Sequence, residues 1–469
     1  MSEFQTPNER VLSTLNLDGT RRWMRPVLAA GDFWKKRMIT GWALIALFVA
    51  LPLIQVGGKP SILLDLPRRE FTFFGATLLA TDTVLLMLGL LGIFLSVFLI
   101  TALFGRAWCG WGCPQTVYME FVFRPIERLI EGSLKDQEKL DAKKLSGRRV
   151  LKWAIYAVLS VVLANVFLAY FVRVETLVHW ITSAPSEHPE GFAVVGITSV
   201  MMFIDFAWFR DQMCVVACPY ARLQSVLLDK RSLVVLYDSN RGEPRGKLQR
   251  KSVDELAIGA VQEVGDCVDC AACVRTCPTG IDIRNGLQLE CISCTQCIDA
   301  CDAVMDKIKK PRGLVRYGAQ QEIEDKVSMS AKHHLLRVRT ALYPLGLLII
   351  GGLFLFALTK RTNAEVNVLR GIGAPFVVMD SGDVQNTLRV KIHNHSGKDH
   401  AYQVTLNNAS DLQLVVPNNP IPVKAGELRT EGMFVIGKAA AIGRGRDLEL
   451  VVDDGETLKK TLTFRLLGP

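Results

Sequence analysis

The chain has 469 residues, and a typical domain size of roughly 150 residues allows for about three domains. Apolar residues make up 49% of it, the mean hydropathy is +0.24 and the formal net charge is +9. This composition excludes a disordered or fibrous chain and indicates membrane-spanning segments. The excess of Lys and Arg then fits loops facing an anionic membrane surface, and no nucleic-acid partner is expected.

The N-terminal segment, residues 1–37, is polar and basic. No small-residue cleavage site follows a short apolar core, so no removable signal peptide is expected. Five later runs are apolar over about 20 residues, which is the length a helix needs to cross a membrane. The predicted spans are about 38–56, 78–104, 150–172, 192–209 and 340–358. The fourth is the weakest because Asp205 lies within it.

Lys and Arg are unevenly distributed among the loops that join these spans. The N-terminal segment, loop 105–149 and region 210–339 are rich in them, whereas loops 57–77 and 173–191 are poor. Because positive loops stay in the cytoplasm, the N-terminus and region 210–339 are predicted to be cytoplasmic. Five crossings then place residues 362–469 on the opposite side.

Residues 362–469 change in character and predict an all-β domain. Short segments rich in β-branched residues alternate there with Gly, Asn, Asp and Pro at roughly 8–12 residue spacing, which is typical of a β-sandwich. The predicted strands lie in Thr387–Ile392, Tyr402–Leu406, Leu412–Val416, Met433–Ile436, Leu448–Val452 and Leu458–Leu466.

All twelve Cys lie between residues 109 and 301, on the predicted cytoplasmic side. Tight clustering favours metal ligation in a reducing compartment over disulfides. Residues 267–277 and 291–301 both carry Cys with spacings x2, x2 and x3, the bacterial two-cluster ferredoxin pattern, within a domain at about 258–310. In that pattern the fourth Cys of each run ligates the other cluster. The predicted [4Fe–4S] ligands are therefore Cys267, Cys270, Cys273 and Cys301 for one cluster, and Cys291, Cys294, Cys297 and Cys277 for the second.

The second run departs from the pattern at one position. Pro278 follows the first run as the pattern requires, but Asp302 takes the place of the second Pro. This change removes no ligand, and we expect it to alter the local turn and the potential of the cluster. A zinc site would instead use two CxxC pairs.

The remaining four Cys form two CxxxCP motifs, Cys109–Pro114 and Cys214–Pro219. Each follows a predicted span, so the arrangement resembles an internal repeat. The i, i+4 spacing predicts two thiols on one helical face. Two such pairs could hold one soft cation, Cu(I) or Zn(II), or a further iron–sulfur cluster, or they could be structural.

Other cofactors are not indicated. The sequence has no Gly-rich dinucleotide fingerprint, so the electron donor is expected to be a protein or a quinol rather than NADH. No His lies deep inside a predicted span, which argues against a transmembrane haem with two His ligands.

Taken together, the ferredoxin runs at 267–301, the paired CxxxCP motifs, the spans and the β-sandwich tail resemble the family called CcoG, FixG or RdxA. The resemblance covers nearly the whole chain. It implies a multi-pass α-helical protein of the bacterial inner membrane with a two-[4Fe–4S] ferredoxin domain and a periplasmic, immunoglobulin-like C-terminal domain.

The resemblance also implies a function. Members assist cbb-type cytochrome c oxidase by reducing Cu(II) to Cu(I), with assembly factors or copper chaperones as expected partners. The implied catalytic copper site comprises Cys109, Cys113, Cys214 and Cys218. The alternative is an electron-transfer subunit between a quinol or soluble donor and a partner enzyme, without a copper role. A scaffold that docks the oxidase is a third interpretation, and a homodimer stays open.

Overall fold

A computed structural model describes most of the chain, which divides into two compact units, Met1–Phe354 and Leu355–Pro469. Each unit is considered by itself. The first six residues of the predicted ferredoxin domain, 258–263, lie outside the described residues. The full set outside the description is 1–12, 17, 19, 67–69, 80–81, 142–145, 248–263, 327–337, 360–363, 372, 395–397, 408 and 457.

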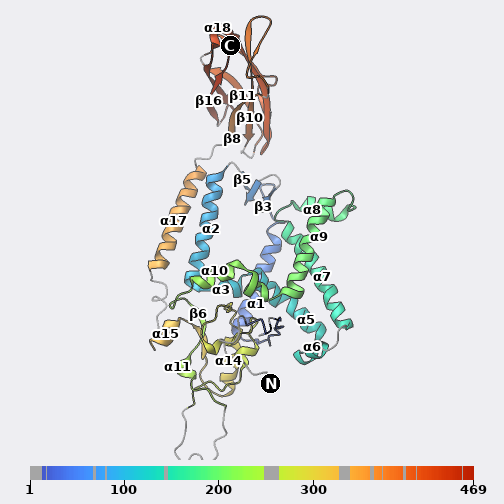
Figure 1. The fold of residues 1–469 in the computed structure, drawn as a ribbon, viewed down its shortest axis with the longest axis vertical. Coiled ribbons are helices and arrows are strands. Elements are labelled where there is room, and N and C mark those ends of the chain that lie inside the picture. Colours follow the sequence, from blue (N-terminus) through green and yellow to red (C-terminus); the bar gives the residue numbers. More distant parts are fainter. Residues whose placement is uncertain are drawn as a thin grey trace, which may run out of the picture. The chain divides into compact units, whose positions relative to one another are not determined.

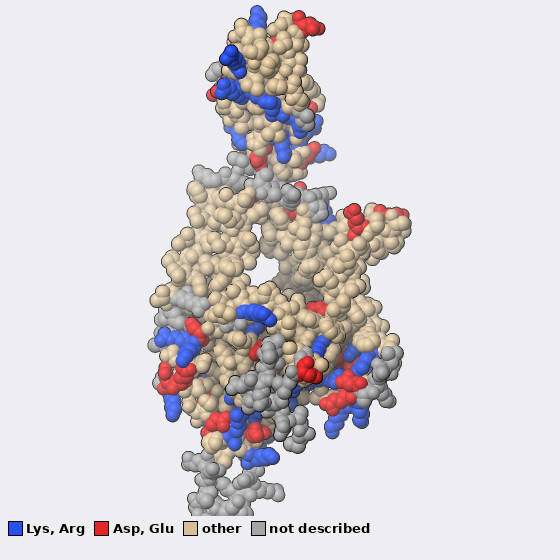
Figure 2. Space-filling model, viewed as in Figure 1, with Lys and Arg blue, Asp and Glu red and all other residues tan. Residues whose placement is uncertain are grey.

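Four helices among the described residues are long and apolar enough to cross a membrane, and they match four of the five predicted spans. Figure 2 shows almost no charged side chains over α2 and α9, whereas charged residues gather around α6 (Leu134–Asp141) and α15 (Gln320–Glu324). An apolar outer surface is what lipid tails require. The four are α2 (Thr83–Phe104), α7 (Gly147–Leu168), α9 (Pro189–Ile204) continued by η3 (Asp205–Phe209), and α17 (Val338–Thr359).

The first predicted span, 38–56, differs from the structure. Its helix, α1, begins earlier, at Asp32, and ends at Ala50. Residues 55–56, predicted as helix, instead form β1 (Gln55–Val56), which pairs with β2 (Lys59–Pro60). α1 is not among the helices apolar enough to cross a membrane, because Lys35, Lys36 and Arg37 lie in its first turns.

The second predicted span, 78–104, began too early. Its first residues belong to β5 (Ala76–Leu79), and α2 starts at Thr83. The connection between α1 and α2 contains a three-stranded antiparallel sheet in the order β3 (Ile62–Asp65), β4 (Glu70–Phe73) and β5. The apolar residues at the end of β5 lie close before the apolar helix, but Asp82, the N-cap of α2, marks the boundary between them.

The long helices associate in pairs (Figure 1). α2 and α17 lie side by side, and the rings of Phe98 and Tyr343 meet edge to face with centroids 6.2 Å apart. α7 packs along α9, and α8 (Val174–Thr182) lies in the connection between them. Phe206, which lies in η3, stacks its ring on that of Phe123, with the centroids 4.3 Å apart. This stacking joins the end of the α9–η3 helix to the segment that follows the first CxxxCP motif.

The cysteine-rich region is built around a two-stranded sheet and several short helices. β6 (Val234–Tyr237) pairs antiparallel with β7 (Val315–Gly318), so the sheet brackets the region between them in sequence. The core of this region consists of buried aliphatic side chains from the sheet and helices, packed among the cysteines. The helices among its described residues are α11 (Ser239–Gly242), α13 (Ala272–Arg275), η5 (Ile283–Asn285) and α14 (Gln296–Lys307).

The C-terminal unit is an all-β domain, as predicted. Each of the six predicted strand segments lies within an observed strand or extends one residue beyond it. Side chains of β10 alternate strictly between buried and half-buried. The buried faces of the two sheets form one apolar core, without any Cys. One sheet contains β8 (Ala364–Arg370), β9 (Val377–Val378), β10 (Asp383–Asn394), β12 (Leu412–Val415) and β14 (Leu428–Lys438); the other contains β11 (His400–Asn407), β13 (Ile421–Val423), β15 (Arg446–Asp453) and β16 (Lys459–Leu466).

Candidate iron–sulfur and thiol sites

The two ferredoxin-type runs fold as matching loops, each followed by a helix, α13 or α14. In both loops the residues on either side of the second Cys have a left-handed backbone. Residues other than glycine rarely adopt this conformation, and a β-branched threonine does so least readily. The same uncommon conformation at equivalent positions indicates loops shaped to direct several side chains to one point. The residues and φ angles are Asp269 (48°), Ala271 (53°), Ser293 (53°) and Thr295 (62°).

Each loop borders a cavity lined by thiols. The thiols of the two predicted ligand sets lie around separate cavities, and the fourth Cys of each run lies with the other run. The ligand assignment itself stays a prediction. The first cavity is lined by Cys267, Cys270, Cys273 and Cys301, and the second by Cys277, Cys291, Cys294 and Cys297 together with Cys273.

The protonation chemistry of these thiols fits metal ligation. Burial raises the pKa of Cys291 and Cys294 to about 11 and the pKa of Cys273 and Cys301 to about 12. Buried thiols grouped in this way lose their protons readily when a metal cation shares the site. The eight thiols of the two loops suit two [4Fe–4S] clusters. Among the described residues, no three His, Cys, Asp or Glu side chains lie close enough together to hold a single metal ion.

The absence of a second Pro has a local structural effect. α13 ends at Arg275, just before the Cys277–Pro278 pair, whereas α14 continues through Cys301 and Asp302 to Lys307. The carboxylate of Asp302 accepts a hydrogen bond from the backbone N–H of Gly313, at 2.9 Å. Because Asp keeps its backbone N–H and Pro does not, the helix after the second run can continue.

The CxxxCP motifs do not place their thiols on one helical face, and that prediction was wrong. Cys109 lies in the short helix α3 (Ala107–Trp111), but Cys113 is extended, with ψ at 125°, and is the N-cap of α4 (Pro114–Tyr118). The physical reason is the proline, which disfavours helical geometry in the preceding residue and starts a new helix.

The second motif repeats this geometry. Cys214 lies in η4 (Met213–Ala217), and Cys218 is the extended N-cap of α10 (Pro219–Leu227), with ψ at 110°. Four residues before the first Cys of each motif, the preceding helix ends at Gly105 or Arg210, with φ and ψ of 58° and −129° or 53° and −125°. The internal repeat therefore extends to the backbone conformation.

The four CxxxCP thiols converge next to the second ferredoxin run. Cys109, Ile292 and Cys294 form one buried cluster, against which Cys214 and Tyr220 pack. The charges of Cys113 and Cys218 also act on the pKa of Cys109, which burial raises to about 11. Thiols from two motifs that are about a hundred residues apart in sequence thus surround one region beside Cys294.

A buried amide supports this region. Gln224 of α10 is fully buried and accepts a hydrogen bond from the Cys109 thiol at 2.9 Å. Its amide nitrogen donates to Thr101 at the end of α2, at 3.0 Å, and to the hydroxyl of Tyr220, at 2.7 Å. Gln224 therefore joins the two halves of the repeat directly at a CxxxCP thiol.

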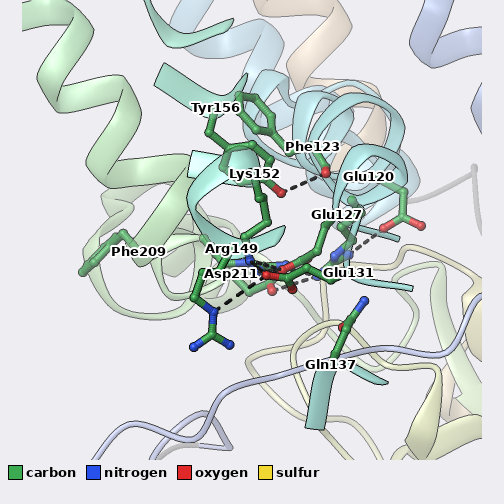
Figure 3. A network of polar contacts seen from close by, with 12 residues as sticks. Glu120, Phe123, Glu127, Glu131, Gln137, Arg149, Lys152, Tyr156, Phe209 and Asp211 are labelled. Atoms are coloured by element: carbon green, nitrogen blue, oxygen red, sulfur yellow. Dashed lines mark hydrogen bonds and ion pairs between the residues drawn. The ribbon is translucent and has the colours of Figure 1, made fainter. Parts of the chain in front are cut away.

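A network of buried ion pairs holds the two motifs together (Figure 3). Arg124 of α5 (Arg124–Glu131) bonds Asp211 at 2.8 Å, and Arg210 bonds Glu127 at 2.7 Å. Lys152 of α7 also contacts Glu127, at 3.2 Å. Burial would raise the pKa of Glu127, but Arg210 and Lys152 bring it down to about 2. These pairs connect the helix after the first motif to the turn before the second.

The network also explains an unusual residue. Arg210 has the backbone conformation that Gly105 has in the first repeat, and a residue other than glycine pays about 1–3 kcal/mol for such strain. Removing one partner of a buried ion pair typically costs about 3–5 kcal/mol. The paired contacts with Glu127 are therefore large enough to hold Arg210 in this conformation. Comparing the two CxxxCP repeats could have revealed this position, whereas nothing in the sequence pairs Arg210 with Glu127.

Comparisons with known proteins agree with this geometry. Residues 209–320 match the family described as "4Fe-4S dicluster domain", and residues 86–132 match one described as "4Fe-4S binding domain". Residues 354–469 match the "IG-like fold at C-terminal of FixG". The second match contains the first CxxxCP motif, and the third covers the all-β unit.

Three curated relatives resemble the chain over most of its length. The protein RdxB of Cereibacter sphaeroides is 32% identical over 94% of this chain and 95% of its own. RdxA of the same organism is 31% identical over 84% of each chain, and the nitrogen fixation protein FixG of Rhizobium meliloti is 33% identical over 82% of this chain and 79% of its own.

A solved FixG-related protein from Vibrio parahaemolyticus matches 23% of this chain and 98% of its own, at 16% identity and a TM-score of 0.21. The two ferredoxin-type loops, the matched iron–sulfur domains and the full-length relatives lead to one conclusion. The chain belongs to the FixG/RdxA family and is an iron–sulfur electron-transfer protein.

Proposed function

We propose that the protein is a membrane-bound cupric reductase that converts Cu(II) to Cu(I) for the assembly of a cbb-type cytochrome c oxidase. One observation carries the proposal: Cys109 and Cys214, from the two CxxxCP motifs, pack against Cys294 of the second ferredoxin run. A soft metal held by the CxxxCP thiols would lie directly beside an iron–sulfur ligand loop. On this proposal the reduced copper passes to chaperones or assembly factors, and the donor is a quinol or a soluble protein.

The chemistry needs only one electron per copper ion. The [4Fe–4S] clusters, when bound, supply single electrons, and the donor is oxidised by one electron as Cu(II) becomes Cu(I). The CxxxCP thiols bind the copper substrate and release their protons as they do so. Thiolates prefer Cu(I), so the site stabilises the product and increases the driving force.

A second candidate is a plain electron-transfer protein whose CxxxCP thiols hold a third cluster and have no copper role. The match of residues 86–132 to a 4Fe-4S binding domain favours it, because that segment contains Cys109 and Cys113. The wild-type protein would then contain about twelve iron atoms per chain rather than about eight.

The experiment that separates these functions replaces Cys214 and Cys218 together by Ser. We expect iron to stay at about eight per chain, and copper binding and Cu(II) reduction to fall at least tenfold, because serine is a poor ligand for a soft ion. Met213→Leu, next to Cys214, is the matched control and should change neither. A loss of about four irons would support a third cluster, and unchanged copper reduction would show that these thiols are structural.

We further propose that the N-terminal segment and region 210–339 are cytoplasmic and residues 362–469 are periplasmic, which requires α1 to cross the inner membrane with the four apolar helices. The alternation of basic and non-basic loops supports this orientation. An alkaline phosphatase fusion after Leu466 should be active, and a fusion after Asp306 should be inactive. Activity only in the Asp306 fusion would reverse the orientation, which is the result expected if the N-terminus is cytoplasmic and α1 does not cross. Activity in neither would mean that α17, the one apolar helix between the two fusion points among the described residues, does not cross.

A further inference from the structure

Two arginines lie buried between the CxxxCP thiols and the second ferredoxin run. Arg37 of α1 is 2% exposed, and its Nε donates to the backbone oxygen of Gly110, inside the first CxxxCP motif, at 2.9 Å. Arg37 also lines a cavity with Cys214 and Cys294. Its Nη1 is buried and has no hydrogen-bond partner among the described residues.

Arg106 makes a parallel connection. It is 3% exposed, precedes α3, and donates from Nη1 to the backbone oxygen of Leu289, just before the second run. Burial raises the pKa of Cys109 and of Cys291 to about 11, and the charge of Arg106 acts against both shifts. Its Nε, like Nη1 of Arg37, is buried and unpartnered among the described residues.

Neither arginine forms an ion pair within the described residues, which separates them from their neighbours. Arg124 and Arg210 are equally buried, but each bonds a carboxylate. A buried cation without a counter-charge is costly, by several kcal/mol. The carboxylate of Glu120 lines the same cavity as Arg37 and acts on it electrostatically, but Glu120 is already paired with Arg124. An additional anionic group would therefore stabilise both Arg37 and Arg106 in the working protein. Thiolate-bound metal centres on both sides would supply that charge.

We infer that Arg37 and Arg106 are shared positioning residues that raise the reduction potential of the centre held by Cys291, Cys294, Cys297 and Cys277 and couple it to the CxxxCP site. An added electron makes a thiolate-bound cluster more negative, so a nearby unpaired cation favours the reduced form. Both guanidiniums also lie beside the first CxxxCP motif. The same charges therefore attract electrons toward the CxxxCP thiols, where the proposed function has them leave for copper. The coupling to the CxxxCP site rests on the proposed function, whereas the effect on the reduction potential does not.

The test is a redox titration of the purified full-length protein, followed by electron paramagnetic resonance. Arg37→Gln should leave iron at about eight per chain but make reduction of one cluster at least tenfold less favourable, a shift of about 59 mV to lower potential. Arg37→Lys should keep the potential near wild type although it loses the Nε bond to Gly110. Arg106→Gln should shift the same cluster, and provides the second variant if Arg37→Gln does not fold.

Arg284 provides a matched control. It lies beside Cys273 of the other set, but Asp282 and Asp269 already pair with it. Arg284→Gln should therefore leave the cluster of the second run unchanged. Unchanged potentials in Arg37→Gln and Arg106→Gln would overturn the inference, as would equal shifts in Arg37→Lys and Arg37→Gln. A wild-type protein that fails to reduce Cu(II) but shows these shifts would refute only the copper function.

Discussion

Replacing Cys277 by Ser is expected to destroy the cluster of the second run rather than that of its own run. The reason is its position: Cys277 lines the cavity of Cys291, Cys294 and Cys297, beyond α13 from its own loop. Iron should fall from about eight toward about four per chain, because the hard serine hydroxyl is a poor replacement for a thiolate ligand of the cluster. The remaining paramagnetic signal should equal that of Cys294→Ser.

The reciprocal change is Cys301→Ser, which should reproduce Cys270→Ser. Cys301 lines the other cavity together with Cys270. Asp306→Asn, on the exposed end of α14, is a suitable control and should retain all the iron. If Cys277→Ser instead gave the spectrum of Cys270→Ser, each run would hold its own cluster and the crossed assignment would be wrong.

The ferredoxin loops could be predicted because their information is local. Three Cys separated by two residues each can bind one cluster only if the loop bends around it. Residues with a left-handed backbone, such as Ala271 and Thr295, produce this bend in each loop. The strands of the tail were equally local, since alternation along β10 appears directly in the sequence. In both cases the residues that define the feature are neighbours in the chain.

The errors came from boundaries and from proline. The run 38–56 is mostly apolar, yet its last two residues form β1, because hydropathy alone does not distinguish an apolar strand from the end of an apolar helix. For the CxxxCP motifs, the i, i+4 spacing alone predicts one helical face, but Pro114 and Pro219 restrict the Cys before them to an extended conformation.

The residues that link the two thiol sites were missed because their partners are distant in sequence. Arg37 meets Gly110, Arg106 meets Leu289, and Gln224 meets Cys109. An Arg at the end of an apolar run is normally interpreted as a cytoplasmic anchor at the membrane surface. Only the folded structure shows that Arg37 and Arg106 are buried, and that each keeps a guanidinium nitrogen without a hydrogen-bond partner among the described residues.

Gly110→Ala is expected to slow Cu(II) reduction at least tenfold while leaving the iron in place. A Cβ at Gly110 would lie 2.6 Å from the backbone oxygen of Ile292 and 2.7 Å from that of Ser293. Both are backbone atoms of the second ferredoxin loop and cannot rotate away, so the two segments must separate, at a typical cost of about 1–3 kcal/mol. Electron transfer through protein slows steeply as the distance between centres grows.

The measurement is the rate at which Cu(II) reoxidises the dithionite-reduced protein, followed by the recovery of iron–sulfur absorption in a stopped-flow instrument. Gly196→Ala is the matched control, because it lies in α9 and its added Cβ would meet nothing within 4 Å. The control should react like wild type. If Gly110→Ala also reacts like wild type with its iron intact, electrons do not leave through this contact. If it loses about four irons instead, the contact with Gly110 supports the second cluster rather than the route from it to the CxxxCP thiols.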